Sequence, residues 1–186
     1  GAHFGEWEIG VARVGTLGYP GAMIAKRIGH PVIEKFINDA RLDMNLGTLF
    51  GIRSMDEVLA ALRRGEMITI TIDQNIRENR GVFVDWMGRP ASTIRSSSWI
   101  ARETGAPVFA GYSCRVAPGR YRGVITEEIP WEPCPGDPEK ELLINTRNHA
   151  RAQEKIILEH PEMWLWIHRR WKVQPEGVPS PYKDDV

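Results

Sequence analysis

The spacing of apolar and polar residues predicts six helices. The clearest lies over residues 54–66, where Met55, Val58, Leu59 and Leu62 form one apolar stripe after a capping-box pattern. A proline near the start and a glycine at the end favour another helix over residues 20–29. The expected helices cover residues 7–18, 20–29, 31–45, 54–66, 92–105 and 140–160.

Short runs of β-branched and aromatic residues predict the strands. "MITITI" (67–72) is uniformly apolar or β-branched, which is typical of a buried strand, and it stops at Asp73. Strands are also expected over residues 47–52 and 81–88, and residues 106–116 and 120–129 should form a hairpin. Helices alternating with strands predict an α/β fold with a mostly parallel, mixed sheet flanked by helices. Binding sites in such sheets gather at the carboxyl ends of the strands, where Asp73 falls.

Length and composition are those of one ordinary globular domain over residues 1–186. The chain is 42% hydrophobic and 26% charged, which sets aside disordered and fibrous classes. Its 24 basic and 24 acidic residues cancel, so no overall charge favours nucleic acid as a partner. Cys114 and Cys134 lie far apart without metal-like spacing, and no run of 18 apolar residues predicts a membrane span.

The start of the chain, "GAHFGEWEIG", carries the first candidate chemistry. A histidine can remove a proton from a hydroxyl near neutral pH, and a carboxylate on its other nitrogen fixes the tautomer. His3 and Glu8 could meet in this way across the turn at Gly5. By itself the pair is also compatible with a packed histidine beside a surface glutamate.

Three further features have both a functional and a structural interpretation. Arg41 ends an amphipathic helix, and Asp73 either positions His3 or the acceptor or only caps its loop. "WLWIHRRWK" (164–172) places basic residues among three of the seven tryptophans, which suits either a bilayer surface or a tryptophan-rich core with a basic edge. The remaining histidines match no metal-ligand spacing and are interpreted as surface or packing residues, His168 being the one to watch: His30, His149, His160 and His168.

Taken in order, five motifs resemble those of one family. "HFGEWE", "GEMITITIDQN", "GVFVDWMGRPA", "IARETGAPV" and "WLWIHRRWK" are similar to successive motifs of the bacterial lipid A biosynthesis (lauroyl/myristoyl) acyltransferases. These belong to the lysophospholipid acyltransferase superfamily, known for its H-x4-D/E motif. The resemblance extends from residue 1 to about residue 173 and implies a glycerolipid-acyltransferase-like fold.

The resemblance assigns roles to individual residues. His3 and Glu8 match the catalytic motif, and Asp73 matches the first acid of a D-Q-D-like loop in which Asn75 replaces the second acid. Arg41 matches an arginine thought to engage phosphate or carrier groups. The basic residues near the end of the match are expected to bind phosphates of the acceptor: Arg169, Arg170 and Lys172.

The implied reaction is O-acyl transfer without a metal, a cofactor or an acyl-enzyme intermediate. His3, oriented by Glu8, would deprotonate a hydroxyl of a lipid A precursor, which attacks an acyl thioester on acyl carrier protein. The oxyanion would be stabilised by backbone amides or Arg41. Family members carry an N-terminal membrane anchor, so we expect an N-terminally truncated fragment of an enzyme at the membrane surface, on the cytoplasmic face of the bacterial inner membrane.

Alternatives remain open at this point. The donor could be coenzyme A, and the acceptor could be another glycolipid or a lysolipid. A metal-dependent hydrolase would use His3 and Glu8 as ligands but lacks an evident third ligand. A non-catalytic lipid-binding relic of the same fold is the remaining possibility.

Overall fold

The centre of the molecule is a three-stranded parallel sheet. The computed structural model describes residues 1–50, 54–77 and 80–182. The strands lie in the order β2–β1–β3, with bounds β1 (Gly21–Ala25), β2 (Leu46–Phe50) and β3 (Met67–Thr69). β1 is hydrogen-bonded on both sides, because Gly21 pairs with Leu46 of β2 and with Met67 of β3. The predicted α/β fold with a parallel sheet and flanking helices is confirmed.

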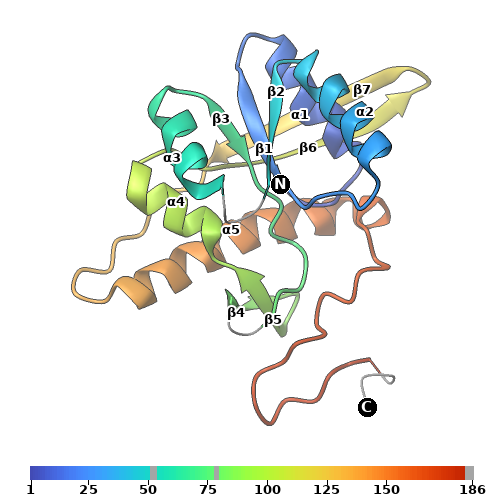
Figure 1. Ribbon diagram of the computed structural model, residues 1–186. Helices are drawn as coiled ribbons and strands as arrows, with labels where there is room; N and C mark the ends of the chain where they lie inside the picture. The colour runs from blue at the N-terminus through green and yellow to red at the C-terminus, as the bar shows by residue number, and fades with distance from the viewer. Residues whose placement is uncertain (51–53, 78–79, 183–186) are drawn as a thin grey trace.

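Helices connect these strands and cover both edges of the sheet. α2 (Pro31–Leu42) links β1 to β2, and α3 (Met55–Arg63) links β2 to β3. α1 (Trp7–Thr16) precedes β1 and contacts β2. Figure 1 shows α1 and α2 beside β2, and α3 beside β3 at the other edge. In the loop that follows β3, Ile72 and Asp73 are buried.

The remaining elements pack around this sheet: in Figure 1 α5 lies below it, and the β6–β7 hairpin passes behind it. α4 (Ser96–Thr104) and the long α5 (Pro138–Glu159) pack together, and α5 runs across the molecule in Figure 1. Two antiparallel hairpins pair separately from the parallel sheet: β4 (Gly81–Trp86) with β5 (Arg89–Ile94), and β6 (Phe109–Ala117) with β7 (Arg120–Glu128). α5 contacts both β4 and β6, so it joins the two hairpins to the rest of the fold.

One apolar core joins the two ends of the chain. Phe4 and Trp164, 160 positions apart in the sequence, are both buried in it and pair as an isolated antiparallel bridge. A short 3-10 turn, η3 (Pro161–Met163), leads the chain into this position. The core residues are Ala2, Phe4, Val84, Trp86, Ala91, Ala110, Ala150, Ile156, Ile157 and Trp164.

Three predicted elements differ from the structure. Residues 20–29 are not a helix: they contain β1, whose short apolar run is buried between two strands and cannot be distinguished from helix by periodicity alone. The strand predicted over 67–72 ends at Thr69. Within 92–105 the helix begins only at Ser96, because the preceding residues belong to β5. Residues 51 and 52 of the strand predicted over 47–52 lie outside the described residues.

Candidate active site

Backbone hydrogen bonds from two distant segments fix the turn that carries His3. The N–H of Leu165 donates to the carbonyl oxygen of His3 at 3.1 Å, and the N–H of Gly5 donates to Met163 at 2.9 Å. On the other side the N–H of Glu6 donates to Ser113 of β6 at 3.0 Å. The turn is therefore part of the folded body, although it lies at the start of the chain.

Gly5 is required by the geometry of this turn. Its φ is +53°, in the left-handed region that favours glycine. A Cβ atom at this position would lie 2.3 Å from the carbonyl oxygen of Ser113, which is backbone and cannot move aside easily. The glycine between His3 and Glu8 thus allows close contact between the turn and β6.

The carboxylate of Asp73 holds His3. Asp73 Oδ1 lies 2.9 Å from His3 Nδ1, and Asp73 Oδ2 accepts the backbone N–H of His3 at 2.9 Å. Ionised Asp73 can only accept, so Nδ1 carries the proton of the neutral ring and Nε2 is left as an acceptor. Within the described part of the chain, His3 Nε2 has no hydrogen-bond partner. This arrangement suits a general base.

Asp73 is ionised in spite of its burial. The residue is 2% exposed, and burial by itself disfavours the charged form. The hydrogen bonds and charge of His3, together with the indole N–H of Trp164 at 3.0 Å from Oδ2, outweigh burial and lower the pKa of Asp73 below its ordinary value. The carboxylate therefore stays charged beside the histidine across the neutral pH range.

Glu8, which was predicted to orient His3, is paired with Arg41 in this structure, and the described residues show no hydrogen bond between it and His3. Glu8 lies in the first turn of α1, and Arg41 of α2 donates to both of its carboxylate oxygens, at 3.2 Å and 2.5 Å. A third donor of Arg41 reaches Thr48 Oγ1 at 3.2 Å. Because α1 begins between His3 and Glu8, the carboxylate of Glu8 faces α2 and Asp73 takes the position on the ring.

An apolar groove runs between α1 and α2 and begins at the Glu8–Arg41 pair. Its volume is about 390 Å³, and most of its lining is apolar. Phe36 lines it while remaining 73% exposed at the surface. The lining residues are Glu8, Ile9, Ala12, Arg13, Thr16, Phe36, Ile37, Ala40, Arg41 and Met44.

Arg170, which was predicted to bind phosphate, is enclosed in the fold. Its side chain is fully buried, with the guanidinium 4.5 Å from the ring centroid of Trp86. It donates to the carbonyl oxygens of Ser92 at 2.8 Å and Gln74 at 3.2 Å, and to Thr93 Oγ1. Burial lowers the pKa of Arg170 to about 10, which keeps it charged at neutral pH. Arg170 therefore ties the loop after Asp73 to β5 and is not exposed to a phosphate.

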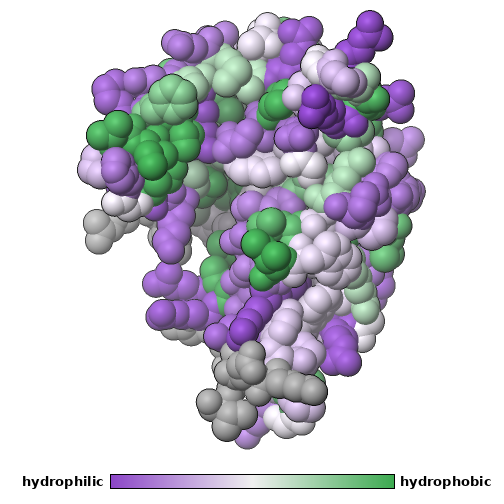
Figure 2. All heavy atoms as spheres, turned by 90° about the vertical axis from the view of Figure 1, so that its right-hand side faces the viewer, coloured by the Kyte–Doolittle hydropathy of each residue, from purple (hydrophilic) through white to green (hydrophobic). Residues whose placement is uncertain are grey.

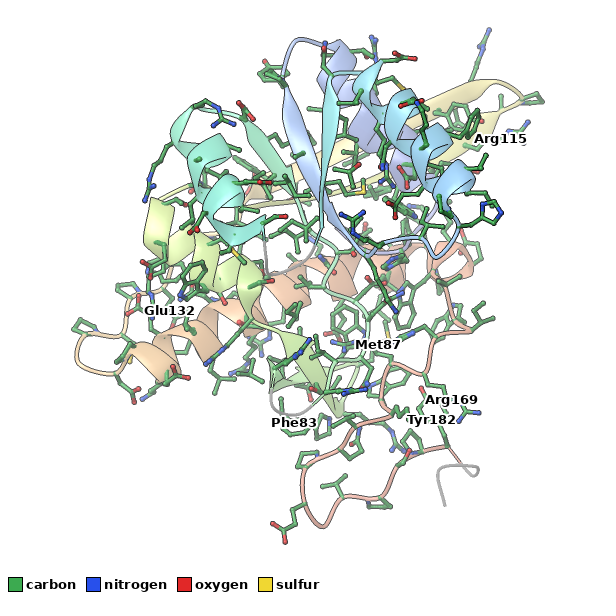
Figure 3. All side chains as sticks on the ribbon, in the orientation of Figure 1. Phe83, Met87, Arg115, Glu132, Arg169 and Tyr182 are labelled. Atoms are coloured by element: carbon green, nitrogen blue, oxygen red, sulfur yellow. The ribbon has the colours of Figure 1, made fainter. Side chains whose placement is uncertain are left out.

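Arg169 and Lys172, by contrast, are exposed. The guanidinium carbon of Arg169 lies 5.7 Å from the ring centroid of Tyr182, and Figure 3 shows the two side chains close together at the lower right. Trp164 is buried against the rings of Trp86, Trp166 and Trp171. The next three residues, Leu165, Trp166 and Ile167, are 40%, 52% and 88% exposed, so this segment is anchored in the core by Trp164 and Arg170 and presents apolar and basic side chains at its surface.

Two residues of this region were not assigned a role from the sequence. Asn75 accepts the N–H of Val173 at 3.0 Å through its side chain, and its backbone N–H donates to His168 Nε2 at 2.8 Å. Trp164 donates to Asp73, as described above. A buried indole N–H needs a hydrogen-bond acceptor. This requirement is the one feature of the sequence that could have pointed to a polar contact of Trp164. The loop 73–75 is thus held by the C-terminal segment along its whole length.

Two searches of the described residues gave negative results. Over residues 1–50, 54–77 and 80–182, no group of three or more His, Cys, Asp or Glu side chains could hold a metal ion. In the same residues no helix combines the length and hydrophobicity that crossing a membrane requires.

Comparison with known proteins shows the family. The sequence model of the bacterial lipid A biosynthesis acyltransferases matches residues 1–173. The chain is 28% identical to a lipid A biosynthesis lauroyltransferase and to a palmitoleoyltransferase of Escherichia coli (strain K12), with 98% of this chain covered in both comparisons. It is 26% identical to a lipid A biosynthesis acyltransferase of Haemophilus influenzae. The chain spans 58% of the length of each of these relatives.

Proposed function

The chain belongs to the bacterial lipid A biosynthesis acyltransferase family, and on this premise we propose that it transfers a fatty acyl chain from an acyl thioester to a hydroxyl of a lipid A precursor. The observation that carries the proposal is the 2.9 Å hydrogen bond between His3 Nδ1 and the buried carboxylate of Asp73. It leaves Nε2 as a base next to the helix that borders an apolar groove. A general base and a place for a hydrocarbon chain are what this reaction needs.

The proposed mechanism uses one histidine as base and then as acid. His3 Nε2 takes the proton of the acceptor hydroxyl while the oxygen attacks the thioester carbon. The C–S bond of the tetrahedral intermediate then breaks, and the imidazolium returns the proton to the leaving thiolate. Asp73 stabilises the imidazolium in between, which is the role that the sequence had assigned to Glu8.

Glu8 and Arg41 are proposed to act on the substrate side. Arg41 is 7% exposed, whereas the side chain of Glu8 is 44% exposed, so the arginine holds a carboxylate that remains accessible. The acyl chain would extend from this pair into the groove between α1 and α2. Acyl carrier protein is the donor that we propose, and coenzyme A is the alternative that the assay compares.

Acceptor and membrane contacts are proposed for two other surfaces. Arg169 and Lys172 are exposed cations suited to the phosphates of a lipid A precursor. α2 exposes three apolar side chains, Val32 (71%), Ile33 (48%) and Phe36 (73%). Figure 2 views the side of the molecule where α2 lies and shows hydrophobic atoms gathered at the upper left of the picture. Such a surface suits a bilayer, in agreement with the proposed site of action at the cytoplasmic face of the inner membrane.

The test is an acyl-transfer assay on the full chain. Labelled acyl thioesters of carrier protein and of coenzyme A are each incubated with a lipid A precursor, and products are separated by thin-layer chromatography. We expect transfer by the wild type and its loss in His3→Ala. The matched control is His30→Asn, which replaces an exposed histidine and preserves the N-cap of α2.

Three results would decide against parts of the proposal. Transfer that persists in His3→Ala rejects the assigned base. Transfer only to a different glycolipid or to a lysolipid rejects the assigned acceptor. Binding of lipid A precursor with no transfer from either donor indicates the non-catalytic lipid-binding alternative.

A further inference from the structure

Three donors reach the carboxylate of Asp73, and only one comes from outside the His3 turn. Oδ1 is bonded to the His3 ring, while Oδ2 accepts both the backbone N–H of His3 and the indole N–H of Trp164. Trp164 lies 91 positions after Asp73. Its indole N–H is therefore the donor to this carboxylate that does not belong to the His3 turn.

The indole of Trp164 is itself held rigidly. It is 5% exposed, and its ring lies 6.0 Å from the centroid of Trp86, 4.7 Å from Trp166 and 6.2 Å from Trp171. The last two contacts are edge-to-face, a geometry that favours fixed ring orientation. The neighbouring Leu165 N–H binds the carbonyl of His3. One short segment thus fixes both the base and its carboxylate.

We propose that Trp164 is a positioning residue of the site: its indole N–H holds Asp73 Oδ2 so that Oδ1 faces Nδ1 of His3. A carboxylate with its second oxygen fixed cannot rotate away from the ring. A buried carboxylate deprived of one donor also binds a proton more readily. The effect on catalysis rests on the proposed function, whereas the hydrogen bond can be tested without any activity.

The first experiment observes the bond directly in the full chain. With tryptophan labelled by ¹⁵N, the Nε1–H resonance of Trp164 should move as Asp73 titrates, and this movement should disappear in Asp73→Asn. The Nε1–H of Trp166, which donates to the carbonyl of Pro161, should not respond. A Trp164 resonance that is identical in wild type and Asp73→Asn overturns the proposal, even if the protein proves inactive.

The second experiment measures catalysis in Trp164→Phe, which keeps an aromatic ring and removes the donor. Relative to wild type, kcat should fall about 10- to 100-fold, as expected for a lost hydrogen bond to a charged group, with little change in KM. Trp166→Phe removes an indole N–H from a ring that is 52% exposed, and it is the matched control. Equal kcat values in the two variants overturn the proposal.

A pH profile separates positioning from a merely structural role. In Trp164→Phe the acid limb of kcat should move to higher pH, because Asp73 then accepts a proton more easily. The other charged or titratable groups near Asp73 are His3, His168, Arg170 and the amino group at Gly1, and the substitution leaves all of them in place. An unshifted acid limb in a folded variant contradicts the proposal; if the variant does not fold, the resonance experiment on wild type decides.

Discussion

The two hydrogen-bonded pairs at the site, His3–Asp73 and Glu8–Arg41, are built in opposite ways. In the His3–Asp73 pair the acid is buried, with 2% of its side chain exposed, and the ring is 25% exposed. In the Glu8–Arg41 pair the cation is buried, at 9%, and the acid is 44% exposed. Each pair thus has one enclosed member and one that reaches solvent.

This difference predicts which member of each pair acts on a substrate. A buried charge must be fully hydrogen-bonded, and it is therefore fixed. Asp73 and Arg41 each have three hydrogen bonds, so they act as supports. His3 and Glu8 are the members that can meet a substrate. The sequence motif joins His3 and Glu8, but in the fold each has its own support.

Removing the buried acid should have the largest effect. Asp73→Asn keeps the shape of the side chain but favours the wrong tautomer of His3. The value of kcat should therefore fall about 10³- to 10⁴-fold, which corresponds to about 4–5.5 kcal/mol of activation free energy. Single-turnover acyl transfer measures the change. Asp56→Asn, at an exposed position of α3, is the control. A loss below tenfold would show that His3 does not need the buried acid.

His149 provides a contrast to His3, because it is a buried histidine whose ring is hydrogen-bonded to a serine and not to a carboxylate. His149 is 4% exposed, and its Nδ1 lies 3.1 Å from Ser97 Oγ. Burial, with a smaller contribution from the amino group at Gly1, lowers the pKa of His149 from 6.5 to about 4. Because the folded state resists protonation, stability present above pH 6.5 is lost as the pH falls toward 4.

Between pH 7 and pH 4.5 the expected loss is about 2.5 kcal/mol of unfolding free energy, because the pKa falls from 6.5 to about 4 on folding. Urea denaturation at pH 7 and pH 4.5 measures it. His149→Gln should flatten this pH dependence, and His160→Gln, at a surface position, should not. Parallel curves for His149→Gln and wild type would assign the acid sensitivity to other groups.

Breaking the second pair should cost less. Arg41→Met removes the donors that fix Glu8, but a carboxylate that is 44% exposed can be hydrated instead. We expect a loss of about 2 kcal/mol in kcat/KM, close to 30-fold. Lys35→Met, on the exposed side of the same helix, is the control. Full activity in Arg41→Lys would show that the two-point contact with Glu8 is unimportant.

The smallest effect is expected from filling the groove. Ala40→Phe adds a ring to the space between α1 and α2, so transfer of long acyl chains should fall about tenfold, or about 1.4 kcal/mol, while short chains are transferred nearly as before. Competition between acyl donors of different length measures this ratio. Ala40→Ser, of similar size to the original, should leave the preference unchanged. Equal losses for all lengths would exclude the groove as the acyl site.

Local patterns predicted most helices and the β6–β7 hairpin, because their periodicity and end residues are encoded within each segment. β1 was missed because a short strand between two others has no polar face to reveal its period. Its Gly21 was interpreted as part of a helix. In the structure a Cβ there would lie 2.2 Å from the carbonyl oxygen of Met67, so the glycine serves close strand pairing.

The candidate residues were identified by motif, but their partners depend on the fold. Asp73 meets His3 because Ile72 pairs with Gly1, a contact between positions 71 residues apart. Glu8 meets Arg41 because α1 and α2 both lie against β2. Arg170 shares its sequence pattern with Arg169, and only the packing of the core shows that one is enclosed and the other exposed.

The dependence of the His3 turn on Met163, Trp164 and Leu165 has a consequence for protein synthesis. His3 and Asp73 both leave the ribosome before the segment that fixes them, which emerges only after α5. During translation, the site is therefore completed near the end of these 186 residues. A product terminated before Trp164 would contain both His3 and Asp73 and still lack the contacts that hold them together.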